Sequence, residues 1–193
     1  RLVFVHDYAL APEAVWAALT DPAELREWAP FDSPRSLAQP GPVTLVMAGG
    51  DGTEQTSAEV TRADAPRLLE YTWDKDRLRW ELTPTPTGTR LTLSHTVTDR
   101  SWLSKVTAGW HICLDVAERC LAGAPIGRIV AGEAKRVGWD RLNVEYARRL
   151  GADHAVTSSP EALSGLIRKL TDGHRVDMVI AAAGAVVALG GVP

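Results

Sequence analysis

Hydrophobic and polar residues alternate in two different ways along this chain, and the change between them divides it. Between residues 33 and 98, apolar side chains recur at about every second position, which is typical of half-buried strands. From Ser101 to Gly123 they recur at steps of three and four, which predicts a helix of about six turns with one buried face. The pattern therefore predicts a run of sheet followed by one long helix that covers it.

An opening strand and two short helices are predicted before the alternating part. The strand, residues 2–10, places Phe4, His6 and Tyr8 on one face. Pro12 and Pro22 each begin a short helix, because proline is favoured at the first helical position. Further strands are expected at residues 43–47, 53–62, 68–73, 77–83 and 89–98. Together these elements indicate an antiparallel meander with one buried side.

The character of the chain changes at Gly151. Before it, residues 129–150 carry a second helical pattern. After it, residues 159–170 read as a helix and residues 176–182 as a buried strand, an αβ pair that does not continue the antiparallel pattern. We therefore expect a domain of residues 1–150 and an αβ tail of residues 151–193 that is not a complete domain.

Composition and charge narrow the classes of partner. The 193 residues carry a net charge of -3, which offers no electrostatic basis for binding nucleic acid. Residues 178–193 are apolar but shorter than a membrane-spanning helix and are interrupted by glycines, so no membrane partner is expected. Cys113 and Cys120 lie on one helix too far apart to bridge, which favours the reducing cytoplasm. No zinc-ligand spacing and no phosphate-binding glycine loop occurs, so neither a metal nor a cofactor is expected.

His95 is the sharpest candidate for chemistry. The alternation points it inward among leucines, where we favour a core or cavity-wall histidine bonded to a neighbour. The alternative is a polar handle for a ligand or a general base. Cys113 lies on the buried stripe of the long helix, where an inert thiol is expected. His111 and Asp115, four residues apart, are expected to form a surface pair.

Large aromatic side chains also fall on inward positions. They either fill the core or line a cavity for an apolar or aromatic ligand, and the sequence leaves both alternatives open. No residue is assigned a catalytic role. The candidate ligand-binding residues are Trp28, Tyr71, Trp73, Trp80, His95, Trp110 and Cys113.

Three segments together resemble the SRPBCC superfamily: residues 12–28 (PEAVWAALTDPAELREW), 81–95 (ELTPTPTGTRLTLSH) and 109–123 (GWHICLDVAERCLAG). Within it, residues 1–151 are similar to bacterial proteins named after the activator of the heat-shock chaperone ATPase. The resemblance implies an α+β helix-grip fold, in which a curved antiparallel sheet wraps a long C-terminal helix. It also implies a cavity between them, which in relatives holds lipids, sterols, polyketides or other apolar molecules. Some relatives are cyclases or dehydratases.

The tail carries a second resemblance. Residues 146–184 are similar to a piece of the nucleotide-binding domain of zinc-type alcohol dehydrogenases and quinone reductases. Ala181 stands where that family usually has aspartate, and the glycine fingerprint and zinc ligands are absent. Without that glycine-rich turn, dinucleotide binding has no physical basis, so no dehydrogenase activity is expected.

Three functions are compatible with the sequence. The leading hypothesis is the binding of a small apolar ligand. The second is an enzyme of the same fold that uses His95 with a carboxylate or water, and the third is a protein-interaction module, with a homodimer as one arrangement. A pocket of several hundred Å³ with His95 on its wall would support the first two functions, whereas a packed interior would leave the third. A second titratable group within hydrogen-bond reach of His95 would favour the enzyme. No residue supports chaperone binding.

Overall fold

The computed structural model describes residues 1–49, 53–150, 154–156, 178–182 and 185–189. By its internal contacts the chain divides into two units. The first unit contains residues Arg1–Thr98 and His111–Glu133, and the second contains Asp99–Trp110 and Ala134–Pro193.

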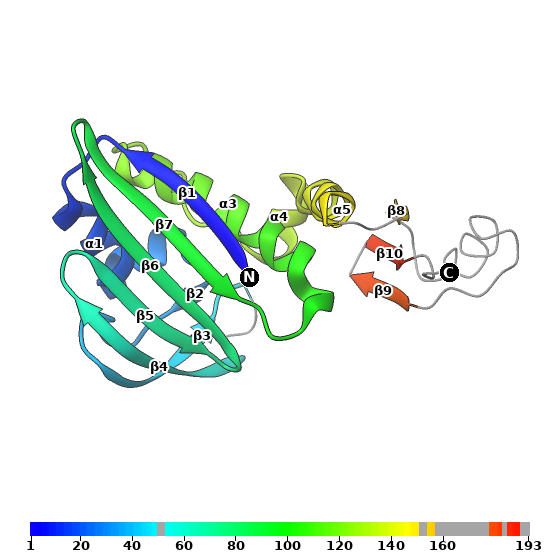
Figure 1. Cartoon of the computed structure of the whole chain (residues 1–193), viewed down its shortest axis with the longest axis horizontal. Helices are drawn as coiled ribbons and strands as arrows, with labels where there is room; N and C mark the ends of the chain where they lie inside the picture. Colours follow the sequence, from blue (N-terminus) through cyan, green and yellow to red (C-terminus); the bar gives the residue numbers. More distant parts are fainter. Residues whose placement is uncertain (50–52, 151–153, 157–177, 183–184, 190–193) are drawn as a thin grey trace, which may run out of the picture. The chain divides into compact units, whose positions relative to one another are not determined.

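A seven-stranded sheet dominates the first unit (Figure 1). Every pair of neighbouring strands is antiparallel, and the order is β1-β7-β6-β5-β4-β3-β2, so β1 and β2 form the edges. The strands are β1 (Leu2–Tyr8), β2 (Phe31–Asp32), β3 (Gly41–Met47), β4 (Gln55–Asp64), β5 (Leu68–Trp73), β6 (Asp76–Thr85) and β7 (Gly88–Thr96). The meander predicted from the alternation is confirmed, with β2 as an additional strand.

The alternation along β1 shows how the sheet separates its two faces. Tyr8 is buried, whereas Val3 and Val5 are each 54% exposed on the opposite side. β1 pairs with β7 over its whole length, from Leu2 opposite His95 to Tyr8 opposite Thr89. The strand of this sheet that comes first in the sequence is therefore hydrogen-bonded to the one that comes last in the sequence.

Two short helices follow β1, as the proline positions predict. They are α1 (Pro12–Thr20) and α2 (Pro22–Trp28), and each begins with its proline. The Asp21 carboxylate caps α2 by accepting a hydrogen bond from the Ala23 N–H at 2.7 Å. α1 packs against α2 and against β6 and β7.

The long helix is α3 (Leu103–Leu121), preceded by a 3₁₀ turn at Arg100–Trp102. The cap of the turn that leads into α3 is Asp99 and not Ser101, the residue at which the predicted helix begins. The Asp99 carboxylate accepts from the Ser101 N–H at 2.9 Å, so the cap lies two residues earlier. The C-terminal half of α3 belongs to the first unit and lies on the inner side of the sheet (Figure 1). A curled antiparallel sheet and a long helix make up the α+β helix-grip fold that the sequence predicts.

The helical pattern of residues 129–150 forms two helices where one is predicted. They are α4 (Ala131–Arg136) and α5 (Trp139–Arg149). Gly138 separates them with a φ of 107°, a left-handed conformation that ends a helix and that glycine adopts without strain. The apolar positions of this pattern, Trp139, Leu142 and Tyr146, all follow Gly138, so the periodicity of the side chains carries no information on the backbone before it.

A three-stranded antiparallel sheet lies in the second unit. Its order is β8-β10-β9, with β8 at His154–Val156, β9 at Met178–Ala182 and β10 at Ala185–Leu189. The strand predicted at 176–182 is therefore present over Met178–Ala182, and its partner is β10 of the same chain. The helix predicted at 159–170 lies outside the described residues. In the described part of the chain, no helix has both the length and the apolar character to cross a bilayer.

Candidate functional site

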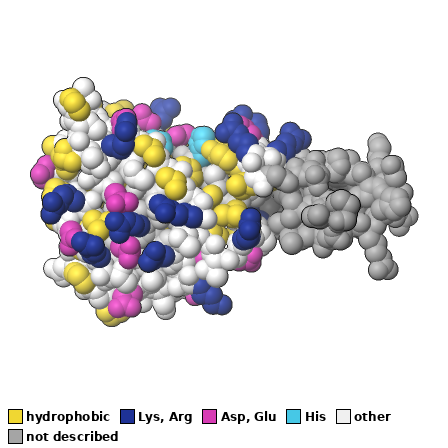
Figure 2. All heavy atoms as spheres, in the orientation of Figure 1, with side chains coloured by type: hydrophobic (Ala, Val, Ile, Leu, Met, Phe, Trp, Pro, Cys, Tyr) yellow, Lys and Arg dark blue, Asp and Glu magenta, His cyan; other side chains and the backbone are white. Residues whose placement is uncertain are grey.

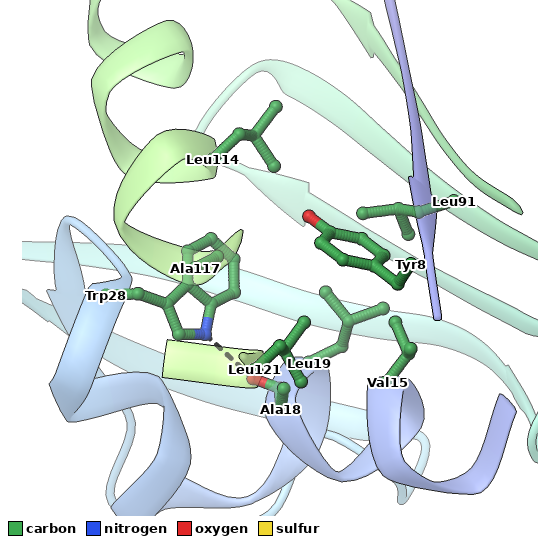
Figure 3. Close-up of a pocket in the computed structure, with 9 residues that line it drawn as sticks. All are labelled: Tyr8, Val15, Ala18, Leu19, Trp28, Leu91, Leu114, Ala117 and Leu121. Carbon is green, nitrogen blue, oxygen red and sulfur yellow. Dashed lines mark hydrogen bonds between the residues drawn. The ribbon is translucent and has the colours of Figure 1, made fainter. Parts of the chain in front are cut away.

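An apolar cavity lies inside the first unit, where β1 and β7 meet α1, α2 and the end of α3 (Figure 3). Its volume is about 10 Å³, close to the room that one water molecule needs. This cavity is far smaller than the pocket of several hundred Å³ that would accommodate a whole ligand. Its lining residues are Tyr8, Val15, Ala18, Leu19, Trp28, Leu91, Leu114, Ala117 and Leu121.

Helical spacing brings the lining residues of each helix to one side. On α1, Val15 and Leu19 are one turn apart, and on α3, Leu114 and Leu121 are two turns apart. Strand pairing supplies the remaining wall, because Tyr8 and Leu91 are diagonal neighbours on β1 and β7. Eight of the nine lining residues are buried, and Leu121, the last residue of α3, is half-buried.

The Tyr8 hydroxyl is the polar group that points into this cavity. Figure 3 shows it between Leu114 and Trp28. The side chain is 6% exposed, and within the described part of the chain its hydroxyl oxygen has no hydrogen-bond partner. Burial raises the pKa of Tyr8 far above its ordinary value, and the charges of Glu118 and Asp115 raise this pKa further. Tyr8 therefore remains a neutral phenol that can donate one hydrogen bond.

Trp28 presents its ring, and not its polar atom, to the cavity. Its indole Nε1–H donates to the Ala18 carbonyl oxygen at 2.9 Å, which ties the end of α2 to α1 (Figure 3). Because this bond satisfies the only polar atom of the indole, Trp28 contributes apolar surface. Among the side chains that line the cavity, the Tyr8 hydroxyl is thus the polar atom still open to a ligand.

The predicted aromatic residues of the first unit pack against one another. Trp28 meets Trp80 edge to face, with ring centroids 6.0 Å apart. Phe31 meets Tyr71 at 6.3 Å and Trp73 at 5.3 Å in the same geometry. Burial raises the pKa of Tyr71, and its hydrogen bond with Trp80 partly offsets that rise. The structure thus brings these side chains together as an aromatic cluster, of which Trp28 also lines the cavity.

The sequence reasoning missed Phe31, which joins two of these aromatic side chains. β2 contains two residues, Phe31 and Asp32, which is too short to produce a periodic signal. The one available signal was its place directly after Pro30, where the chain leaves α2 and enters the sheet.

His95 is buried, 3% exposed, and has a carboxylate partner. Its Nε2 lies 3.0 Å from Asp76 Oδ2, and the second oxygen of Asp76 accepts from the Thr98 N–H at 2.7 Å. Burial lowers the pKa of His95, and the bond with Asp76 counteracts this shift in part. The pair thus links the side chains of the first residue of β6 and the second-last residue of β7.

Asp76 is, like Phe31 and Tyr8, a residue that the sequence reasoning missed as a candidate. Leu78 lies opposite His95 in the β6–β7 pairing, so Asp76 is the diagonal neighbour of His95 on the same face. Alternation along each strand was readable from the sequence. The register between the strands, which brings the two side chains together, was not.

The remaining candidates lie on α3. Trp110 and Cys113 are buried, at 3% and 4% exposure, and burial raises the pKa of the Cys113 thiol to about 12. Cys113 is therefore a neutral, packed thiol, as expected. His111 and Asp115 form the predicted surface pair, with Nε2 and Oδ2 3.4 Å apart and both side chains more than a third exposed. Neither Trp110 nor Cys113 is among the residues that line the cavity.

Charges of both signs intermingle on the outer face of the first unit (Figure 2). Arg79 bridges Glu70 and Glu81 at 3.4 and 2.9 Å, and Arg90 pairs with Asp7 at 2.7 Å on the neighbouring strands. Within the described residues, no group of three or more His, Cys, Asp or Glu side chains is arranged to hold a metal ion.

The family model for the Activator of Hsp90 ATPase homolog 1-like protein matches residues 9–122, which is more than half of the chain. The chain belongs to this family. The match spans α1, α2, the strands β2 to β7 and α3, and it begins one residue after Tyr8, the last residue of β1. It confirms the family resemblance that residues 12–28, 81–95 and 109–123 indicate.

Solved structures of the same fold agree with this assignment. CalU16 from Micromonospora echinospora is 22% identical, with a TM-score of 0.60 over 78% of this chain and 88% of its own. The AHSA1 protein from Silicibacter pomeroyi is 26% identical, with a TM-score of 0.53 over 63% and 96%. DynU16, from the dynemicin biosynthetic locus, is 20% identical, with a TM-score of 0.56 over 64% and 48%. No curated protein sequence matches the chain.

Proposed function

We propose that this member of the Activator of Hsp90 ATPase homolog 1-like family binds a small apolar ligand between its sheet and α3. The observation that carries the proposal is the cavity with apolar walls and one unpartnered hydroxyl, Tyr8. Buried polar groups in folded proteins are nearly always hydrogen-bonded, so an orphaned hydroxyl that points into a cavity marks a place for another molecule. Trp28 of the predicted ligand-binding residues belongs to this wall.

Ligand entry must enlarge the cavity, because about 10 Å³ holds no more than a water-sized group. Leu121 is the lining residue that is not fully buried, and it is the last residue of α3. The final carbonyls of a helix lack intrahelical partners, so helix ends open at lower free energy than helix centres. We place the entrance at Leu121 for this reason.

Membership of the family supports a ligand rather than a purely structural interior. Proteins of this superfamily hold apolar molecules at the corresponding place between sheet and helix. One protein of the same fold, DynU16, comes from the dynemicin biosynthetic locus, which agrees with a small organic molecule as the ligand.

Filling the cavity tests the proposal. Ala117 is 4% exposed and lines the wall, so Ala117→Leu places three additional carbons where the ligand would lie. We expect saturable binding of the neutral dye Nile red to wild type and at least a tenfold loss in Ala117→Leu. Ala122→Leu, the same change at an exposed position next to α3, is the control and retains wild-type affinity. Native mass spectrometry of freshly purified protein identifies a co-purified ligand. Absence of saturable dye binding to wild type would contradict the proposal.

The enzyme alternative has one specific observation in its favour, the Asp76 carboxylate 3.0 Å from His95 Nε2. A histidine oriented by a carboxylate is a common general base. Two features make us rank this function second: Asp76 already bonds the Thr98 N–H, and neither His95 nor Asp76 lines the cavity. If His95→Ala leaves both ligand affinity and any turnover unchanged, no functional role remains for the pair.

A further inference from the structure

We infer that the cavity selects an uncharged ligand with one hydrogen-bond acceptor, which the Tyr8 hydroxyl binds. The inference rests on the proposed function, because it names the class of molecule that the same cavity takes. Carbonyl compounds such as ketones have this chemistry, whereas carboxylates and plain hydrocarbons do not.

First, the Tyr8 hydroxyl needs a hydrogen-bond acceptor. Its hydroxyl is buried, has no partner among the described residues and faces walls of carbon. A buried hydroxyl without a partner is unfavourable by the free energy of its desolvation. An oxygen that accepts from Tyr8, whether of a ligand or of the single water for which the cavity has room, removes this penalty, whereas a hydrocarbon that fills the cavity leaves it in place. One acceptor suffices, since the lining offers one open donor.

The second step is the negative charge around the cavity. Glu118 and Asp115 lie close enough to act on the Tyr8 hydroxyl and disfavour a negative charge there. Leu19, Trp28 and Leu121 stand in the last turns of α1, α2 and α3, so three helix C-termini, which are partially negative, adjoin the lining.

The third step is the lack of compensation for an anion. None of the nine lining residues is basic, so a carboxylate in the cavity would lose its hydration and meet no cation. The single hydroxyl donor is too little to stabilise a buried charge, because such charges require pairing and several hydrogen bonds. A neutral acceptor experiences neither penalty.

Three probes with seven carbons separate these effects: 2-heptanone has one neutral acceptor, heptanoate is an anion at pH 7.5, and heptane has no acceptor. Displacement of Nile red measures each affinity, after the affinity of every variant for the dye has been determined. Each affinity is compared with the transfer of the same probe from water to an alkane, because heptane gains more from leaving water than the ketone does. Relative to that reference we expect 2-heptanone to bind wild type about tenfold more tightly than heptane, the ratio for one buried hydrogen bond, and heptanoate to bind more weakly than both.

Tyr8→Phe retains the ring and removes the donor. We expect 2-heptanone to lose about tenfold in affinity for this variant, while heptane binds it at least as well as it binds wild type. Tyr146→Phe, the same chemical change at a tyrosine outside the cavity, is the control and leaves all three affinities unchanged.

The outcomes separate the two proposals. If heptane binds but Tyr8→Phe does not alter the preference for the ketone, or if heptanoate binds as tightly as the ketone, the inference is wrong and the proposed function stands. If neither Nile red nor any probe binds wild type, both are overturned.

Discussion

Two buried polar side chains on neighbouring strands, Tyr8 and His95, differ in whether they have a hydrogen-bond partner. Tyr8 ends β1 and His95 lies near the end of β7, and because the strands are antiparallel the two residues occupy opposite ends of the same ladder. Both are almost fully buried, at 6% and 3% exposure. His95 has the Asp76 carboxylate at 3.0 Å, whereas Tyr8 has no partner within the described part of the chain.

The difference separates a structural polar group from one available to a ligand. A satisfied pair such as His95–Asp76 fixes the ends of two strands and leaves no bonding capacity on the facing atoms. An unsatisfied hydroxyl reduces stability and retains its capacity to bond. The sequence singles out His95 and not Tyr8 as a candidate for chemistry, whereas the proposed function rests on Tyr8.

The largest effect is expected from Asp76→Ala. This substitution removes the partner of buried His95 and also the acceptor of the Thr98 N–H. We expect the free energy of unfolding to fall by about 2–3 kcal/mol, since two groups lose their hydrogen bonds and one of them is buried. Urea denaturation measures the change. The double variant His95→Leu with Asp76→Ala should recover part of the loss, and a loss below about 0.5 kcal/mol would contradict a structural role for the pair.

A second effect concerns pH. Because the pKa of His95 is lowered in the folded protein, the unfolded chain takes up its proton at a higher pH than the folded chain does. The stability from neutral His95 is therefore fully present above the unfolded pKa of about 6.5 and is lost as the pH falls through the folded value. Thermal unfolding between pH 7.5 and 5 measures this loss, and His95→Gln should show a shallower dependence. An equal slope in both proteins would exclude His95 as the titrating group.

Tyr8→Phe should change stability in the opposite direction. Removing a buried hydroxyl without a partner relieves its desolvation penalty, so we expect the free energy of unfolding to rise by about 0.5–1 kcal/mol in ligand-free protein. Urea denaturation again reports the change. A decrease would show that the hydroxyl has a stabilising partner and would remove the contrast with His95.

The smallest effect is expected from His111→Ala. The pair of His111 and Asp115 is surface-exposed and spaced as i and i+4, an arrangement that contributes about 0.3–0.5 kcal/mol. Thermal unfolding at low and high salt measures this contribution. A loss as large as that of Asp76→Ala would show that burial does not distinguish the two histidine–aspartate pairs.

The fold was readable from the sequence wherever the periodicity was long. The meander and α3 each repeat their pattern over several turns or residue pairs, and the prolines before α1 and α2 mark their starts. β2 has two residues, and the break at Gly138 interrupts no apolar stripe, so neither produced a signal.

The candidate site was readable only in part. The pattern correctly placed Trp28 and His95 on the inner side, because facing is a property of one strand or helix. It grouped Tyr8 with Phe4 and His6 on one face of the strand but did not show that this face is buried. Whether such a side chain has a hydrogen-bond partner depends on the register between paired strands and on where the packed helices end. Asp76 reaches His95 through the β6–β7 register, and the cavity beside Tyr8 is bounded by the end of α3. Such relations join residues far apart in the chain, and a periodic pattern does not contain them.

The pairing of β1 with β7 has a consequence for the order of events during synthesis. Residues 2–8 leave the ribosome well before residues 89–95, with which they pair, and the cavity also needs Leu114, Ala117 and Leu121. Tyr8 therefore stays exposed while most of the first unit is translated, and the sheet gains its last strand only after a long delay. A nascent chain that stops before residue 114 has the aromatic cluster of Trp28 and Trp80 but no binding cavity. The ligand binding that we propose therefore requires a chain in which the first unit has been translated through α3.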